Sequence, residues 1–217
     1  MSRVELHPES IPGPAGRLEA VVEVPAVAHS DAVGIICHPH PVYHGTMNNK
    51  VVHTVSRAMN RLDRPAVRFN FRGVGESHGE YAHGEGETED ALAVIEWARE
   101  RWPAAEIWLA GFSFGAFVAL RAAAGTRPAC LITIAPPIQR FDLADLPRPP
   151  CPWLIVQGDR DELVDSRRVL EWATGLRPAA IVELMEDTDH FFHGRLTRLR
   201  ETIMGFLRSS APACEDS

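Results

Sequence analysis

The stretch "LAGFSFGAFVAL", Leu109–Leu120, places two glycines and a serine between an apolar run and a second segment with few polar residues. Gly111, Ser113 and Gly115 form the pattern GxSxG, which is weak alone and informative directly after a strand and directly before a helix. A sharp strand-to-helix turn strains the serine backbone, and a β-carbon two residues before or after it would clash. The stretch therefore predicts a turn that exposes a reactive Ser113 hydroxyl. The alternative is a glycine-rich turn whose serine caps the helix.

Short apolar runs of strand length recur on both sides of this turn, and most are continuously apolar rather than alternating. They are Leu18–Val24, Ala32–Cys37, Pro65–Phe71, Glu106–Gly111, Cys130–Ala135, Trp153–Gly158 and Ala180–Met185. Continuously apolar runs are typical of strands that helices cover on both faces. The opening segment "RVELH", followed by residues that favour turns, predicts a hairpin with the first of these runs.

Segments with helical periodicity separate most of these runs, and their apolar positions fall on one side of each helix. The clearest lie within residues 51–62, 92–102, 169–173 and 196–207. Alternation of strands and helices predicts an α/β fold with a mostly parallel central sheet of about seven or eight strands. Because the sequence has no repeat, low-complexity stretch or linker, we expect a single domain over residues 1–217.

The composition is that of an ordinary globular protein, with 45% hydrophobic and 24% charged residues in a chain of 217. A net charge of −7 argues against nucleic acid or an anionic membrane as the main partner. We expect no signal peptide or membrane anchor, a cytoplasmic location, and a monomer or small homo-oligomer. Because no two cysteines have CxxC spacing, we expect them to be reduced; they are Cys37, Cys130, Cys151 and Cys214.

Two histidines follow the last predicted strand, in the segment "EDTDHFFHG". A serine hydroxyl is a poor nucleophile unless a neighbouring base takes its proton, and ligands of such sheets bind at the carboxyl ends of the strands. His190 is nearer to the strand end, so we expect it to be the general base, with His193 nearer to the final helix. The structural alternative for either is a loop histidine that ties down the start of that helix.

The preceding strand ends in "WLIVQGDRDELVD", which offers three carboxylates that could hold the imidazole in one tautomer. Asp161 has the best spacing for a loop that bends back across the sheet, and we expect it to be the orienting residue. Asp165 is expected to cap the next helix, and Asp159 suits a turn. The resulting order of serine, aspartate and histidine along the chain is that of the α/β-hydrolase fold.

Several motifs in this order resemble those of a known family. They are "HPHP", "GTMNNKVV", "FNFRGVGES", "AGFSFGA", "IAPP", "QGDRDELV" and "HFFHG". Taken together, they are similar to those of small serine esterases of the α/β-hydrolase fold that lack a lid. The resemblance implies a catalytic triad of Ser113, His190 and Asp161. One departure is Asp189 next to the base, where many relatives have small residues, and we expect this carboxylate to influence the pKa of His190.

The segment "IICHPHPVYHGTMNN", Ile35–Asn49, is rigid and polar directly after an apolar run. In "HPHP" both prolines lack an N–H, so His40 carries the only backbone amide among its immediate neighbours. Acyl transfer needs two donors for the oxyanion, and we expect the amides of His40 and Phe114 to supply them. His38 is then structural. The alternative is a zinc site made by His38, His40 and His44, but extended neighbours point to opposite sides, so we expect no metal.

The glycine-rich segment Arg68–Glu87 lacks the sixth residue of a GxGxxG motif, so no nucleotide or other cofactor is expected. We expect a mobile loop beside the pocket, with Arg72 as an ion-pair anchor. The segment 136–152 is too short and too rich in proline for a helical lid, which favours small acyl esters as substrates. A thioesterase, a peptidase or a catalytically silent binding protein with the same fold are the alternatives.

Overall fold

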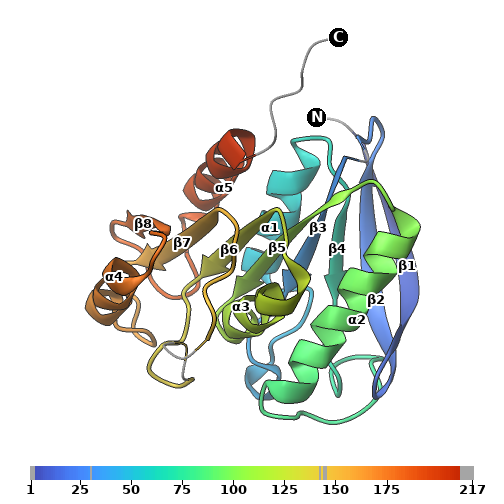
Figure 1. The fold of residues 1–217 in the computed structure, drawn as a ribbon, viewed down its shortest axis with the longest axis horizontal. Coiled ribbons are helices and arrows are strands. Elements are labelled where there is room, and N and C mark those ends of the chain that lie inside the picture. Colours follow the sequence, from blue (N-terminus) through green and yellow to red (C-terminus); the bar gives the residue numbers. More distant parts are fainter. Residues whose placement is uncertain (1–2, 30, 142, 144–145, 211–217) are drawn as a thin grey trace.

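A computed structural model describes residues 3–29, 31–141, 143 and 146–210 of the chain. Its centre is an eight-stranded sheet with the order β1-β2-β4-β3-β5-β6-β7-β8 (Figure 1). The strands are β1 (Val4–Gly13), β2 (Gly16–Pro25), β3 (Ala32–Cys37), β4 (Ala66–Phe69), β5 (Glu106–Phe112), β6 (Cys130–Ile134), β7 (Trp153–Gly158) and β8 (Ile181–Met185). The predicted hairpin is confirmed, because β1 pairs antiparallel with β2. β2 also pairs antiparallel with β4, and every other pair is parallel.

Helices cover both faces of this sheet, as the alternating pattern predicts. They are α1 (Lys50–Asn60), α2 (Glu85–Arg101), α3 (Phe114–Thr126), α4 (Ser166–Gly175) and α5 (Leu196–Ser210), with the short 3₁₀ helix η1 (Pro41–Tyr43). α1 and α5 pack on one face, and α2, α3 and α4 pack on the other (Figure 1). The α/β-hydrolase fold expected from the sequence is therefore confirmed.

The strand bounds differ from the predicted ones at a few ends, most clearly at β4. The apolar run predicts a strand as far as Phe71, but β4 ends at Phe69. Beyond that point the Phe71 amide donates to the ring of His38 at 3.1 Å, and the Asn70 side chain accepts from the Met47 amide at 2.8 Å. The His38 ring and the Asn70 side chain thus make hydrogen bonds where the chain leaves the sheet, although the Asn70 amide still donates to the Glu19 carbonyl of β2 at 2.8 Å.

The edge strand β8 is also less buried than its apolar sequence predicts. It pairs only with β7, and Ile181 at its start is 57% exposed. A strand with a neighbour on one side alone has less cover from the helices, so the continuous apolar pattern does not guarantee burial there.

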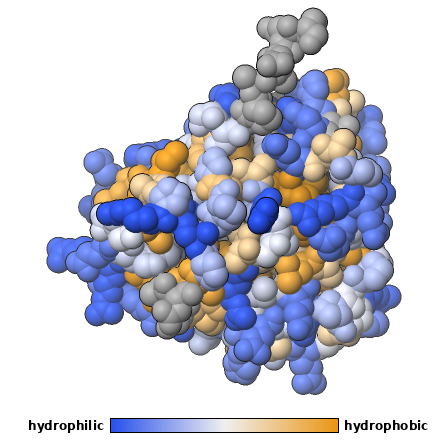
Figure 2. Space-filling model, in the orientation of Figure 1, coloured by the Kyte–Doolittle hydropathy of each residue, from blue (hydrophilic) through white to orange (hydrophobic). Residues whose placement is uncertain are grey.

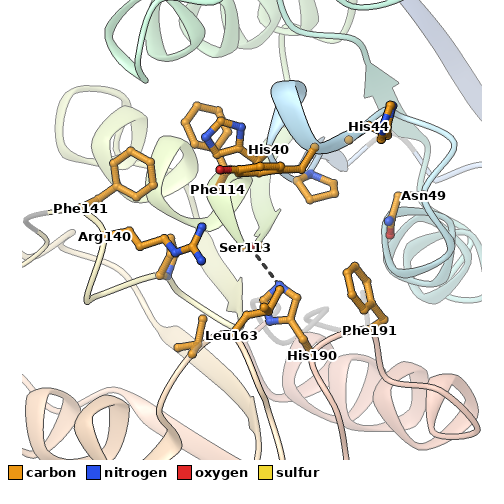
Figure 3. A pocket seen from close by; sticks show the side chains of 15 residues that line it. His40, His44, Asn49, Ser113, Phe114, Arg140, Phe141, Leu163, His190 and Phe191 are labelled. Atoms are coloured by element: carbon orange, nitrogen blue, oxygen red, sulfur yellow. Dashed lines mark hydrogen bonds between the residues drawn. The ribbon is translucent and has the colours of Figure 1, made fainter.

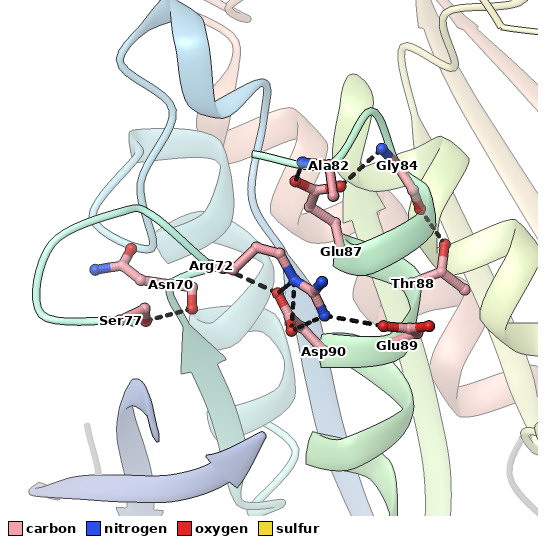
Figure 4. Close-up of polar contacts among 9 residues, drawn as sticks. All are labelled: Asn70, Arg72, Ser77, Ala82, Gly84, Glu87, Thr88, Glu89 and Asp90. Atoms are coloured by element: carbon pink, nitrogen blue, oxygen red, sulfur yellow. Dashed lines mark hydrogen bonds and ion pairs between the residues drawn. The ribbon is translucent and has the colours of Figure 1, made fainter. Parts of the chain in front are cut away.

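The loop between β4 and α2 is fastened to the molecule, whereas its glycines predict mobility (Figure 4). The Ser77 hydroxyl donates to the Asn70 carbonyl at 2.7 Å. The Arg72 backbone amide donates to Asp90 at 2.9 Å, and its guanidinium donates to the same carboxylate at 2.8 and 3.1 Å. The expected role of Arg72 as an ion-pair anchor is confirmed.

The first turn of α2 holds the other end of this loop. Glu87 is fully buried and accepts from the amides of Ala82 and Gly84 at 2.8 and 2.7 Å (Figure 4). A carboxylate at this position satisfies amides that a helix start leaves unpaired. The loop is therefore held at both ends by buried charged side chains of α2.

The outer surface is mostly hydrophilic on the face shown in Figure 2, with apolar side chains in scattered patches. Within the described residues, no helix combines the length and the apolar character needed to cross a bilayer. Cys37 and Cys130 are buried, and Cys151 is partly buried, where burial raises its thiol pKa to about 11. None of these three forms a disulfide, and Cys214 lies outside the described residues.

Replacement of Arg72 by Met should destabilise the fold through the carboxylate it leaves behind. Burial already raises the pKa of Asp90, and the guanidinium is the main opposing influence. Loss of one partner of a buried pair costs about 3 kcal/mol in other proteins. When the pKa of a carboxyl is higher in the folded than in the unfolded protein, the free energy of unfolding falls as pH rises from the unfolded pKa through the folded one. The loss of stability in Arg72→Met should therefore be larger at pH 8 than at pH 5.

Urea denaturation at the two pH values measures this effect. The control is Arg198→Met, which breaks an exposed pair with Glu183 and should cost less than about 1 kcal/mol. Equal losses for the two variants, or a deficit at position 72 that shrinks with rising pH, would contradict the structural role given to Arg72.

Candidate active site

The turn between β5 and α3 has the strained geometry that the GxSxG pattern predicts. Ser113 has φ of 53° and ψ of −119°, outside the regions that residues with a side chain prefer. A β-carbon at Gly111 would overlap the carbonyl of Gly115, and one at Gly115 would overlap the carbonyls of Cys37 and His38. The Ser113 side chain makes no capping hydrogen bond to α3, so the capping alternative is wrong.

The Ser113 hydroxyl instead meets the imidazole of His190. The distance from Ser113 Oγ to His190 Nε2 is 3.1 Å, and His190 Nδ1 lies 2.8 Å from a carboxylate oxygen of Asp161 (Figure 3 shows the first contact). The second contact assigns the proton to Nδ1, because a carboxylate only accepts, and Nε2 is then ready to accept from the serine. The structure thus brings together the three side chains chosen from the sequence.

Asp161 is held by more than the histidine. Its buried carboxylate also accepts from the Gln157 amide at 3.0 Å and from the backbone amides of Leu163 and Val164 at 2.9 and 2.8 Å. These donors fix the carboxylate and compensate for its burial. Gln157 was not singled out from the sequence, although a polar residue at the end of the apolar run "WLIVQG" is a usable signal.

The other two carboxylates of this loop have structural contacts. Asp165 accepts from the Arg167 amide at 2.9 Å and caps α4, as predicted. Asp159 does more than form a turn: it accepts from the Thr188 amide at 3.1 Å, and the Arg160 amide donates to the Thr188 carbonyl at 3.0 Å. These bonds join the loops that carry Asp161 and His190.

His193 lies in the turn before α5 and is paired with Asp189. The Asp189 carboxylate accepts from the His193 backbone amide at 3.0 Å and contacts its ring Nδ1 at 2.8 Å. The His193 side chain is 68% exposed, in contrast to the buried His190. Asp189 therefore makes its side-chain hydrogen bonds with the second histidine.

The HPHP loop lies above the carboxyl end of β3, and its two histidines differ in environment. His38 is fully buried; its Nε2 accepts from the Phe71 amide and its Nδ1 lies 2.6 Å from the Pro39 carbonyl. Burial lowers the pKa of His38 to about 3, so the ring is neutral, as its predicted structural role requires. In the described residues, no three His, Cys, Asp or Glu side chains gather in a way that could hold a metal.

His40 lines the pocket and is held by aromatic neighbours. Its ring centroid lies 4.8 Å from those of Tyr43 and Phe114, and its Nε2 lies 3.2 Å from the Tyr81 hydroxyl. Tyr81 belongs to the loop that Arg72 anchors, so this loop supports the wall of the pocket that His40 forms. In the part of the chain that the structure describes, neither the His40 nor the Phe114 backbone amide donates to a protein group.

Ser113 and His190 open into a cavity of about 380 Å³ (Figure 3). Most of its described lining is apolar or aromatic. The lining residues are Pro39, His40, Tyr43, His44, Gly45, Asn49, Ser113, Phe114, Pro137, Arg140, Phe141, Leu163, Val164, His190 and Phe191. Such a pocket holds a small, largely apolar ligand next to a few convergent polar groups.

Comparisons with known proteins find similar chains of the same fold. The chain is 44% identical to XC6422 of Xanthomonas campestris, an α/β serine hydrolase without a lid, over 96% of both chains with a TM-score of 0.92. It is also 44% identical to an α/β serine hydrolase homologue of Coxiella burnetii, over 95% of this chain and 98% of the other, with a TM-score of 0.90. An uncharacterized protein of Rickettsia prowazekii, RP471, is 33% identical over 206 residues, or 90% of this chain and 86% of that one.

The fold and the similarity to these two structures together identify the chain as an α/β serine hydrolase without a lid. Residues 15–150 match the family described as X-Pro dipeptidyl-peptidase (S15 family), and the chain belongs to this family. Between β6 and β7 the described residues form turns and no helix, in agreement with the absence of a lid expected from the sequence.

Replacement of Gly115 by Ala should disable the site by moving the turn. The new β-carbon would meet the backbone carbonyls of Cys37 and His38, which cannot move aside as a flexible side chain would. We expect a loss of about 2 kcal/mol or more in the free energy of unfolding. Labelling of Ser113 by a fluorophosphonate should fall by at least about tenfold, because a small displacement of a reacting group slows reaction strongly.

The control is Gly205→Ala within α5, where a new β-carbon meets nothing within 4 Å. That change should stabilise the helix by about 0.5–1 kcal/mol and leave labelling intact. Normal labelling of the Gly115→Ala variant would show that the backbone approach is not essential.

Proposed function

We propose that the protein hydrolyses small acyl esters, with Ser113 as nucleophile, His190 as general base and Asp161 as the residue that orients His190. The observation that carries this proposal is the continuous hydrogen-bond chain from serine to imidazole to buried carboxylate, with its serine end in an apolar cavity. Each residue type fits the role, since a serine needs a base and the imidazole needs a carboxylate that fixes its tautomer.

In the first half of the proposed reaction, Ser113 Oγ attacks the acyl carbon while His190 Nε2 takes the hydroxyl proton. The negative charge that forms on the acyl oxygen is stabilised by the backbone amides of His40 and Phe114, and by the N-terminus of α3 that begins at Phe114. His190 then gives its proton to the departing alcohol as the C–O bond breaks. The product of this half is an acyl-serine.

In the second half, a water molecule gives a proton to His190 and attacks the acyl carbon of the acyl-serine. The same two amides stabilise the second oxyanion. Collapse of this intermediate breaks the bond to Ser113 Oγ, which recovers its proton from His190. The acid is released, so ester and water yield an acid and an alcohol and the enzyme is unchanged.

The size of the pocket favours short acyl groups. A volume of about 380 Å³ lies near the lower end of the range for pockets that hold small molecules. Thioesters use the same machinery, and a comparison of kcat/KM for matched oxygen esters and thioesters measures which the enzyme prefers.

A peptidase is the second candidate function, because the family match carries the name of an X-Pro dipeptidyl-peptidase. A dipeptidyl-peptidase has to bind the positive N-terminus of its substrate, for which a carboxylate is the natural partner. Among the described residues that line the cavity there is no Asp or Glu. The lining therefore favours esters over peptides with a free N-terminus. A comparison of kcat/KM for Ala-Pro-p-nitroanilide with that for p-nitrophenyl acetate separates the two functions.

Ser113→Ala should abolish both esterase activity and labelling by a fluorophosphonate. We expect a fall in kcat for p-nitrophenyl acetate of at least about 10³-fold, because loss of the nucleophile leaves only binding and oxyanion stabilisation. Retained activity in this variant would contradict the proposal. Absence of both turnover and labelling in the wild type would favour a catalytically silent binding protein.

His40→Pro tests the predicted amide of the oxyanion hole. His40 has φ of −56° and ψ of 121°, values that proline itself adopts, so the replacement removes the main-chain N–H at a residue whose own dihedral angles suit the ring. We expect kcat to fall by about 10²–10³-fold, as for loss of one oxyanion donor in other enzymes. His40→Ala is the control, since it loses the same ring but keeps the amide. Equal activity of the two variants would remove the His40 amide from the mechanism.

A further inference from the structure

Arg140 is the only Lys, Arg, Asp or Glu among the described residues that line the cavity of Ser113 and His190. Figure 3 shows its side chain extending from the wall of the pocket, with the guanidinium directed toward the space next to Ser113 and His190. The residue itself is exposed and so stands at the rim. The mechanism proposed above assigns it no role.

The backbone that carries Arg140 is fixed on two sides. The amides of Arg140 and Phe141 both donate to the Pro137 carbonyl, at 3.0 and 3.2 Å, which closes a turn directly after β6. The Phe141 ring stacks on that of Phe117 in α3, with centroids 4.4 Å apart and planes at 20°. On the other side, the Gln139 side chain accepts from the Asp165 amide at 3.1 Å. The backbone position from which the Arg140 side chain extends is therefore fixed.

The positive charge of Arg140 is opposite in sign to the net charge of the chain. The whole chain has a net charge of −7, which disfavours the approach of anions in general. Around the cavity the described walls are mainly apolar, so they screen a charge less than water does. The field of Arg140 reaches the oxyanion side of the pocket: burial lowers the pKa of His40 first, and the charge of Arg140 lowers it further.

A guanidinium presents paired N–H donors that match the two oxygens of a carboxylate. We propose that Arg140 binds a carboxylate of the substrate, so that the preferred substrates are small esters with a carboxylate on the acyl or the alcohol part. Half-esters of short dicarboxylic acids and acylated hydroxy acids are the two members of this class. The inference rests on the proposed esterase function and adds a substrate class to it.

Two pairs of chromogenic or titratable esters test this inference. One is mono-4-nitrophenyl glutarate against its methyl ester, and the other is 4-acetoxybenzoate against its methyl ester. In each pair the neutral member carries a methyl ester in place of the free carboxylate, and release of 4-nitrophenol or of the acetyl group is followed in both members. The measured quantity is the ratio of kcat/KM for the anionic member to that for the neutral member, in the wild type and in Arg140→Gln, Arg140→Lys and Arg140→Glu.

In at least one pair the ratio should fall by about 5- to 20-fold in Arg140→Gln, the size expected for one hydrogen-bonded ion pair at a rim. The ratio should be lower still in Arg140→Glu, and in Arg140→Lys it should lie between those of the wild type and Arg140→Gln. In the wild type it should decrease as the salt concentration rises. The control is Arg208→Gln, an exposed arginine on α5 at the other face of the sheet, which should leave both ratios unchanged.

The role of Arg140 would be overturned if the wild type and Arg140→Gln hydrolysed the esters with the same anionic-to-neutral ratio of kcat/KM in both pairs. The esterase proposal would then still stand. Failure of the wild type to hydrolyse any of the four esters would contradict the esterase proposal itself, and the inference would fall with it. The two failures are thus distinguishable in one experiment.

Discussion

The site depends on the close approach of backbone to backbone around Ser113. Gly115 lies against the carbonyls of Cys37 and His38, and Gly111 lies against Gly115, with no room for a β-carbon at either glycine. This packing holds the serine in a left-handed conformation that it would not adopt alone. It also joins the end of β5 to the end of β3, which sets the nucleophile next to the HPHP loop. A strained residue of this kind persists only where its surroundings determine it.

Parallel strands explain how residues far apart in sequence meet at this turn. The loops after β5, β7 and β8 leave the sheet at the same edge, so a serine and a histidine separated by 77 positions come within 3.1 Å. Bonds between the last two loops, through Asp159 and Thr188, then set the spacing of Asp161 and His190. The order of strands brings the groups near one another, and local hydrogen bonds complete the geometry.

Much of this could be predicted from the sequence, because it depends on patterns along the chain. Apolar periodicity predicts the sheet and its two helical layers, and the position after a strand identifies Ser113, His190 and Asp161. The contacts of Gln157, Tyr81 and Arg140 were not predicted, since each depends on where a side chain points after the chain has folded. The loop before α2 was predicted to be mobile because its glycines are visible in sequence, whereas the pairing of Arg72 with Asp90 depends on the packing of α2.

The account's central claim is that Ser113 and His190 act as one unit, and a double-mutant comparison tests it most directly. The measurement is kcat for p-nitrophenyl acetate in Ser113→Ala, His190→Ala and the variant with both changes. Residues that act as a unit lose most of their effect with the first replacement. The double variant should therefore be about as slow as the slower single variant. A double variant whose loss equals the product of the two single losses would show that the two side chains act independently and would contradict the claim.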